Sequence, residues 1–544
     1  MLVGGAGLSP ALAAEPSSPA SARPAPPSSA PAADPAAAPT VAATSAAVDD
    51  GSYEEPAFIR EPPRLPDSMD TQAARRLSLA DAIQLAVKSN LGIVLVKQRV
   101  AIAEQGELQS FGVFEPRLSA AVSHQSSDSA PVIAQNQLAL ETTDDRWSLG
   151  LAQRTRLGTE LALEWSNDRA DTRLGSVAQP LLYRSELGLR LTQPLLRGFA
   201  FRWEVPNAEV LRAEVATARA RQDYRAGLNA TVRDTEQTYW DLVQALQSYQ
   251  VQRGSLQLAE EQLLLTRRQI EAGVLPPSDL INAEGTLAQR ELGLVQAEGG
   301  IAQAADQLRY LLNLPREAWA QPLLPLDVPQ FDDLQVGYET ALDQALKNRP
   351  ELAQLKLDLQ RAALDVRVAS SDRLPQLDAS VSYGLVGQRG DYSGALDRLV
   401  SADARAWSAL LNFTWTPLNR AAGARLESLR LSERALRTLQ DQTLLDLRLE
   451  LRTAIRGLET ADRSVRAAAR FRGLAARSLD AEQRKFLNGT SSNFFVAQRQ
   501  DDLARARLAE LSALIQHRKA ATSLRGAMGV LLDHRHVKLD VRAR

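Results

Sequence analysis

The sequence predicts an α+β protein made of two tandem copies of one unit, each combining amphipathic strands with a very long helical hairpin. Two observations favour this fold class. Stretches of the first half align without gaps on the second half. Each half also passes from a period-two hydrophobic pattern to a seam with apolar residues three and four apart. Each half therefore has alternating strands followed by long helices with coiled-coil spacing, and the fold prediction rests on this order.

The composition of this 544-residue chain argues against several classes of protein. Charged residues make up 24%, and no run of about 20 apolar residues occurs, which disfavours a polytopic helical membrane protein. The net charge of −2 gives no basic footprint for nucleic acid. Without cysteine the chain forms neither disulfides nor Cys-ligated zinc sites. We find no nucleotide loop, metal-ligand spacing or nucleophile constellation, and we therefore expect no enzyme, no catalytic or metal site and no cofactor.

The N-terminal segment differs in composition from the rest. Residues 1–14, MLVGGAGLSPALAA, are small and apolar and end in an A-x-A pattern, but a basic region before them is missing. They are either a truncated signal peptide or part of the Ala-rich tail. Residues 15–66 are rich in Ala, Pro and Ser, and 13 of the 27 prolines fall in the first 66 residues. We expect a disordered linker there, because such a segment has too little apolar surface to bury.

The duplication is visible in two gap-free alignments of the chain with itself. Residues 77–123 align on 336–382 at an offset of 259, and residues 234–314 align on 450–530 at an offset of 216. Identity is low, but the register of the second alignment holds throughout. The alignments divide the chain into a first structural repeat (77–314), a connector (315–335), a second repeat (336–532) and a C-terminal tail (533–544).

Alternating strands are predicted over 117–193 in the first repeat and over 376–416 in the second. In the latter, Leu377, Val381 and Leu385 alternate with small polar residues. The alternation fits two structures. One is a half-buried sheet on a soluble core, and the other is a membrane barrel with apolar residues outward and polar residues inward.

The first repeat contains an insertion among its strands. It has 36 more residues between Pro116 and Pro194 than the second repeat has between Pro375 and Pro417. We interpret the surplus as a strand hairpin over about 146–168. An added hairpin leaves the chain on the same side of the sheet. The sequence leaves open whether this hairpin joins the barrel or forms an extracellular flap.

Long helices follow the strands in both repeats. We predict hairpins over about 205–312, with a tip near 273–278, and over about 418–532, with a tip near 489–493. The first helix of each is about 70 residues, or about 100 Å, long. Each ends at a glycine, which suits a C-terminal cap with positive φ. At the start of the repeats, Ser78 is a predicted N-cap, and Pro350 is expected to end the helix before it.

The order of these motifs resembles the TolC family of outer-membrane efflux and secretion channels. LSLADAIQLAVKSN and its second-copy partner YETALDQALKNRPEL resemble the opening helix of that family. LTQPLLRG and TWTPLN resemble its strand-to-helix junctions, here at Pro194 and Pro417. The connector LLNLPREAWAQPLLPLDVPQ resembles its link between halves, and AGVLPPSDLINAEGTL and NGTSSNFFVAQRQDDLARARL resemble its helix tips. Each motif alone is weak, whereas their order, twice over, is specific.

The resemblance implies an architecture, a location and partners. Strands of three protomers would complete one transmembrane β-barrel in the outer membrane, in contact with its lipid, and the helices would form an all-helical tunnel through the periplasm. The homotrimer would serve as the exit duct of a tripartite efflux or type I secretion system. Its far end would dock on a periplasmic adaptor, or membrane fusion protein, coupled to an inner-membrane pump. From the charge balance we expect no nucleic-acid partner.

The resemblance also implies functional residues at the helix tips. Asp279 matches a family aspartate that rings the closed periplasmic entrance, where neighbouring carboxylates repel one another and attract cations. The alternative is a solvated Asp near a helix start, favoured by the helix dipole. The second copy has Phe495 at the equivalent position, so the gate is expected to include an apolar constriction of Phe494 and Phe495. The residues that match adaptor-docking turns are Gly273, Val274, Leu275, Gly489, Thr490 and Ser491.

Two other functions fit part of the pattern. A coiled-coil scaffold accounts for the helices but not for the strands that precede each hairpin. A periplasmic adaptor is expected to carry one hairpin within β-rich domains, whereas this chain has two tandem copies. The substrate and the partner pump are not specified by any motif.

Overall fold

The computed structural model describes residues 53, 55–70, 72–129, 132–133, 136–137, 140–174, 177–178, 180–198 and 202–537. Contacts divide the chain into two units, residues 1–52 and 53–544, and the description below concerns the second. The expected signal segment 1–14 and residues 15–52 of the expected linker lie outside the described residues.

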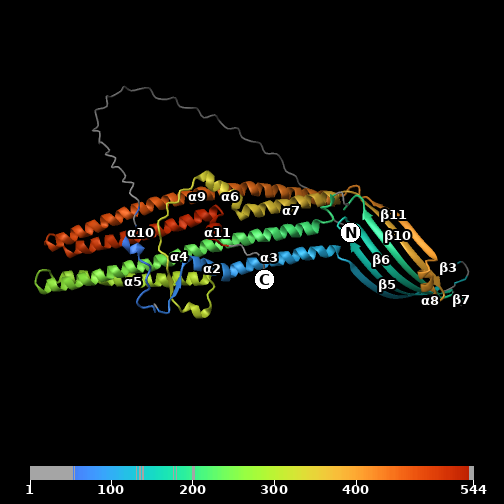
Figure 1. Cartoon of the computed structure of the whole chain (residues 1–544), viewed down its shortest axis with the longest axis horizontal. Coiled ribbons are helices and arrows are strands. Elements are labelled where there is room, and N and C mark those ends of the chain that lie inside the picture. Colours follow the sequence, from blue (N-terminus) through green and yellow to red (C-terminus); the bar gives the residue numbers. More distant parts are fainter. Residues whose placement is uncertain are drawn as a thin grey trace, which may run out of the picture. The chain divides into compact units, whose positions relative to one another are not determined.

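Two long helical hairpins run side by side through this unit (Figure 1). The first consists of α4 (Ala208–Glu271) and α5 (Ser278–Leu311), and the second of α9 (Arg420–Leu487) and α10 (Asn493–Ala527). With 64 and 68 residues, α4 and α9 are each about 100 Å long. The tips of both hairpins lie at one end of the unit and the sheet lies at the other.

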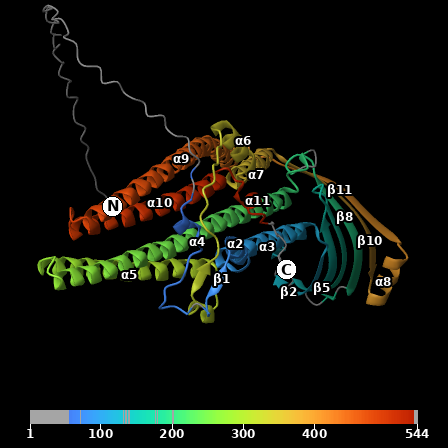
Figure 2. The same cartoon turned by 60° about the vertical axis from the view of Figure 1, so that its left-hand side comes forward.

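The helices form a layer, and the order of neighbouring helices differs between its two ends. Toward the sheet the order is α3 (Leu91–Phe111), α4, α7 (Pro350–Asp372) and α9, and toward the tips it is α5, α4, α10 and α9. The edges of the layer are therefore α9 on one side and α3 with α5 on the other. Figure 2 shows the same arrangement after rotation.

Shorter helices open each repeat as predicted. In the first, α2 (Leu79–Ser89) starts at Ser78, whose Oγ accepts a hydrogen bond from the Asp81 N–H, which confirms the N-cap. In the second, α6 (Tyr338–Asn348) ends before α7, which has Pro350 in its first turn. The remaining helices are α1 (Ala57–Arg60), α8 (Tyr392–Val400) and α11 (Leu531–His534). Among the described helices none alone has the length and hydropathy to cross a membrane, although the bent pair Leu79–Ser89 with Leu91–Phe114 meets that test.

One antiparallel sheet takes strands from both repeats in the order β11-β10-β8-β6-β5-β2. The first repeat supplies β2 (Arg117–Ser129), β5 (Leu140–Arg154), β6 (Glu160–Leu174) and β8 (Leu182–Pro194), and the second supplies β10 (Gln376–Arg389) and β11 (Ala404–Thr414). The short β7 (Val177–Ala178) pairs with β6, and β3 (Val132–Ile133) pairs with β4 (Asn136–Gln137). The inserted hairpin, β5–β6, thus lies within the sheet between β2 and β8.

The two faces of the sheet differ in polarity. One row of directly paired residues is apolar or aromatic from edge to edge, and each of its members is exposed in the monomer: Leu118, Leu151, Leu163, Leu189, Tyr383 and Trp407. A row on the opposite face is polar: Ser123, Arg146, Asp168, Arg184 and Gln388. The sheet does not close on itself, since β2 and β11 end it on either side.

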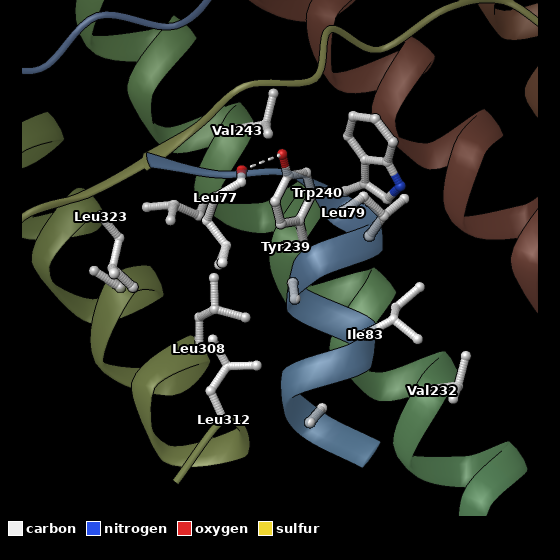
Figure 3. Packing of buried hydrophobic residues seen from close by; sticks show 14 of the residues in the cluster. Leu77, Leu79, Ile83, Val232, Tyr239, Trp240, Val243, Leu308, Leu312 and Leu323 are labelled. Atoms are coloured by element: carbon white, nitrogen blue, oxygen red, sulfur yellow. Dashed lines mark hydrogen bonds between the residues drawn. The ribbon is translucent and has the colours of Figure 1, made fainter. Parts of the chain in front are cut away.

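The main hydrophobic core lies where the first repeat meets the connector (Figure 3). Here β1 (Arg75–Leu77) pairs in parallel with β9 (Leu323–Pro325). The buried Tyr239 hydroxyl donates to the Leu77 carbonyl at 3.1 Å and lies 2.6 Å from a carboxylate oxygen of Asp327. Burial raises the pKa of Tyr239, so it remains a hydrogen-bond donor. This network joins α4 to two segments far apart in the sequence.

The linker prediction is wrong for the described residues between 53 and 66. Ile59 is fully buried and packs with Val465 and Leu514 of the second hairpin, and its carbonyl accepts a hydrogen bond from Gln247 of the first. Tyr53 donates to Glu510 at 3.3 Å. The few large apolar residues at the end of this Ala/Pro-rich stretch pack against the long helices, and this burial compensates for the low average hydrophobicity of the stretch.

The expected C-terminal tail also begins with packed residues. The Arg535 side chain forms an ion pair with Glu236, which is buried in α4, and Val537 packs against the core. His534 and His536 are exposed. Residues 538–544 lie outside the described part of the chain.

Candidate functional site

The two hairpin tips have the same backbone geometry. Gly273 and Gly489 both have φ of +73°, which confirms the predicted caps with positive φ. At the first tip the Gly273 N–H bonds to the Ile270 carbonyl, and the Val274 N–H bonds to the Gln269 carbonyl at 2.8 Å. This pair of bonds is a Schellman motif, and the Gly489 tip repeats it.

The tips carry different side chains on this common backbone. At the first tip Val274 is 70% exposed, and Leu275 is followed by two prolines. At the second tip the Thr490 Oγ1 donates to the Lys485 carbonyl at 3.1 Å. There the Ser491 hydroxyl bonds to Glu482 and holds the pKa of that carboxyl below its usual range, with a smaller contribution from Lys485. One tip is apolar and the other is polar and hydrogen-bonded.

The structure brings two of the predicted gate residues together. Asp279 lies in the first turn of α5 and Phe494 in the first turn of α10. Both line a cavity of about 100 Å³ between the hairpins, together with Gln262, Asn282 and Asn493. A carboxylate from the first repeat and an aromatic ring from the second thus share one small space.

The third predicted gate residue, Phe495, is not part of the cavity lining. Its ring lies 5.6 Å from that of Phe494 and nearly perpendicular to it, and Phe495 remains 48% exposed. Phe494 is 63% exposed. The two rings therefore present an aromatic surface at the tip instead of filling a core.

Two contacts that the sequence analysis missed join the hairpins near the tips. The Asn493 amide donates to the Thr266 Oγ1 at 2.8 Å, and both residues are buried. Arg290 of α5 forms an ion pair with Asp501 of α10, and the Arg290 side chain is only 13% exposed. An internal signal exists for the second contact, because the other repeat has Ala506 and Gly285 at the equivalent positions. Arg290 and Asp501 are charged, whereas the equivalent residues of the other repeat are small and uncharged. This difference indicates that the two charged residues have a role in one copy only.

The predicted junction prolines lie where the sheet gives way to helix. Pro194 is the last residue of β8 and is paired with Asp378. Pro417 lies between the end of β11 and the start of α9.

Within the described residues, no group of three or more His, Asp or Glu side chains is arranged to hold a metal ion.

Comparison with known proteins decides the family. The profile of the outer membrane efflux protein family matches residues 122–314 and 341–530, one stretch in each repeat. The chain belongs to the outer membrane efflux protein family. Membership places the protein in the outer membrane, extending into the periplasm.

Individual proteins agree with this assignment. Nodulation protein T of Rhizobium leguminosarum bv. viciae is 25% identical over 197 residues, which are 35% of this chain and 39% of that protein. The chain thus spans about two fifths of the length of the curated relatives it matches. The Campylobacter jejuni CmeC outer membrane channel has the same fold, with a TM-score of 0.62 and 16% identity over 83% of this chain and 86% of that one.

The open state of the Neisseria gonorrhoeae MtrE outer membrane channel gives a TM-score of 0.59 with 14% identity, over 89% of this chain and 98% of that one. At such identities the likenesses show the fold alone. Both of these proteins are outer membrane channels. The family match disfavours the scaffold and adaptor alternatives.

Proposed function

We propose that three copies of this efflux protein assemble into one channel that serves as the exit duct of a tripartite efflux or type I secretion system. Three open sheets would close one barrel, and three helical layers would close one periplasmic tunnel. The tips would dock on a periplasmic adaptor coupled to an inner-membrane pump. The observation that carries the proposal concerns the two edges of the monomer. Each edge has a strand that pairs on one side only within the described part of the chain, and helices with an exposed apolar face.

The edges of the sheet support this assembly. β2 and β11 each pair on one side only among the described strands, and residues 117–128 of β2 and 404–414 of β11 are exposed. An unpaired edge leaves a row of N–H and C=O groups without partners, which is unfavourable in lipid. Pairing of β11 with β2 of the next copy satisfies both edges, and repetition of that contact closes a ring.

The edges of the helical layer carry matching apolar stripes. On α9, Leu431, Leu445 and Leu449 lie on the face opposite the buried Leu447 and Leu451, and all three are exposed.

The opposite edge has the same property. α3 exposes Leu91, Leu95 and Ile102, and α5 exposes Ile281, Leu292 and Val295, in each case opposite the buried face of the helix. When a helix is apolar on two opposite faces, each face is expected to pack against a different partner. α9 of one copy would pack on α3 and α5 of the next, on the side where β11 meets β2.

A substitution at this edge tests the assembly. Leu449 is 67% exposed, so Leu449→Asp is expected to leave the monomer folded and to place a charge in the contact between copies. Light scattering of the detergent-purified protein should give a trimer for the wild type and mostly monomer for the variant. Arg448→Asp, one residue away on another face of α9, is the matched control and should remain trimeric. A monomeric wild type would overturn the proposal.

We further propose that the tips form the periplasmic gate and the adaptor-docking surface. Around a threefold axis, three Asp279 carboxylates would attract cations, and the Phe494 and Phe495 rings would narrow the entrance. The turns at Gly273, Val274, Leu275, Gly489, Thr490 and Ser491 would meet the adaptor. Gly273, Val274, Gly489 and Thr490 are exposed in the monomer, and Leu275 and Ser491 are half-buried. This accessibility and the position of the turns at the far end from the sheet support the role.

Single-channel conductance in planar lipid bilayers tests the gate. We expect Phe495→Ala to raise the resting conductance several-fold, because it removes a ring from the constriction. Asp279→Asn should lower the preference for cations. Tyr310→Ala, at the exposed far end of α5, is the matched control and should conduct like the wild type. Unchanged resting current in Phe495→Ala would show that the rings do not close the entrance.

A further inference from the structure

We infer that the inserted hairpin β5–β6 is a wall segment of the pore, so that the closed barrel of three copies has eighteen strands. This inference rests on the proposed trimer. Each copy brings six strands in one continuous sheet, of which β5 and β6 come from the insertion in the first repeat. Without them, three copies would close a barrel of twelve.

The hairpin is paired on both of its outer edges. Residues 117–129 of β2 pair with residues 140–152 of β5, and residues 160–170 of β6 pair with residues 182–192 of β8. A flap outside the barrel would leave one or both of these ladders unmade. β2 and β8 are each joined to the hairpin, and neither pairs with the other.

The two faces of the hairpin continue those of its neighbours. Leu151 and Leu163 stand between Leu118 of β2 and Leu189 of β8 in one apolar row. All four are exposed in the monomer, and each is suited to lipid in the closed barrel. A solvated extracellular flap has no reason to carry a lipid-facing row in phase with the strands on either side.

The turn of the hairpin is fixed at the junction with the helices. Gly158 has φ of +82°, and a Cβ there would lie 3.2 Å from the Gly198 carbonyl. The Asn207 amide, directly before α4, donates to the Arg156 carbonyl at 2.9 Å. The hairpin therefore spans the full height of the sheet and ends at the same level as Pro194.

The insertion changes the pore in two ways. Barrel diameter grows roughly in proportion to strand number, so eighteen strands give a lumen about 1.5 times as wide as twelve. The polar face of the hairpin also brings charges to the lumen. Arg146 of β5 forms an ion pair with Asp168 of β6. The hairpin thus adds charges beside those already on β8, where Arg184 lies 2.9 Å from Glu186. The exit is wide and lined by charges of both signs.

Engineered disulfides in the assembled channel test the strand order, because the chain has no cysteine of its own. Ser166 and Glu186 are direct partners across β6 and β8, so Ser166→Cys with Glu186→Cys should form a disulfide in isolated outer membranes. Ser123→Cys with Glu186→Cys joins β2 to β8, which are three strand spacings, roughly 14 Å, apart. That is beyond the reach of a disulfide, so this pair should stay reduced. The reverse result would overturn the inference.

Access of polyethylene glycols to the barrel end of the channel tests the width. The wild type should admit polymers about 1.5 times larger in diameter than a variant in which a short Asn-Gly turn replaces residues 130–181, which joins β2 directly to β8. A matched control replaces α8 in the same way. A Cβ at Gly387 would collide with the Ala395 carbonyl, so α8 lies on the apolar, outer face, and its removal should leave the size limit unchanged.

The outcomes separate this inference from the proposed function. A trimeric channel whose size limit is the same with and without the hairpin overturns the wider barrel and leaves the exit duct standing. A wild-type protein that forms neither trimer nor pore overturns the proposed function. If the shortened variant does not fold, the disulfide pairs still decide the strand order.

Discussion

The two repeats of this efflux protein share a backbone plan and differ in what they place on it. Their long helices end in the same Schellman turn with the same φ. Yet the first repeat contributes four long strands, an apolar tip and most of the main core, whereas the second contributes two long strands, the helix α8 and a polar tip. The turn geometry, which glycine and backbone hydrogen bonds set, is the same in both copies. The side chains differ because each copy packs against different neighbours.

The largest expected effect is a difference in stability between the repeats, because the first repeat contributes most of the main hydrophobic core. Trp240 in α4 is 1% exposed and packs beside Tyr239, with Arg518 over its ring. The equivalent position in the second repeat is Arg456, which is exposed. We expect Trp240→Ala to lower the free energy of unfolding by about 3–5 kcal/mol. Arg456→Ala should change it by no more than about 0.5 kcal/mol.

Urea titration of both variants in detergent, followed by near-UV circular dichroism, measures this difference. Similar losses in the two variants would mean that stability is shared evenly between the repeats, contrary to the distribution of buried residues.

A smaller effect tests the shared geometry of the tips. Gly273→Ala and Gly489→Ala should each destabilise the local turn by about 1–2 kcal/mol, because an L-residue with positive φ is strained. The losses should be equal, since both glycines have the same φ and open space around them. Hydrogen exchange of the Val274 and Thr490 amides, which close the two turns, reports the change.

Gly254→Ala serves as the control for the tip glycines. It lies inside α4 with nothing within 4 Å of a new Cβ, and is expected to stabilise the helix by about 0.5–1 kcal/mol. Unequal responses of the two tips would show that their neighbours, and not the turn alone, set the local stability.

The smallest effect concerns pH and separates the tips. The hydrogen bond from Ser491 lowers the pKa of Glu482 in the folded protein below its ordinary value of 4.5. Its stabilisation is therefore fully present above pH 4.5 and is lost as the pH falls through the lowered folded pKa. The equivalent residue at the first tip is Thr266, which does not titrate.

Acidification below pH 4.5 should thus increase opening of the second turn only. Hydrogen exchange of the Thr490 amide, corrected for the intrinsic rate and compared with that of Val274, measures it. Glu482→Gln should abolish the difference in pH response. Equal responses of both turns in the wild type would contradict the role of Glu482.

Local signals explain why much of the fold was predictable. Ser78, Pro350, Gly273 and Gly489 act on their own backbone within one turn, and alternation along a strand fixes its two faces. The contacts between hairpins were not predictable. Thr266 with Asn493, and Arg290 with Asp501, are more than 200 residues apart. The difference between the repeats marks Arg290 and Asp501 as specific to one copy, but no local pattern says which residue each of them meets.

The sequence by itself determined the tandem duplication, the order of strands and long helices and the positions of the turns, because these follow from repeats, periodicity and glycine. Only the tertiary structure decided three things. It placed the inserted hairpin inside the sheet, it packed Ile59 of the expected linker between the hairpins, and it brought Asp279 and Phe494 into one cavity. Each of these depends on which distant surfaces meet, and that is set by the sum of many weak contacts across the fold and not by any one segment.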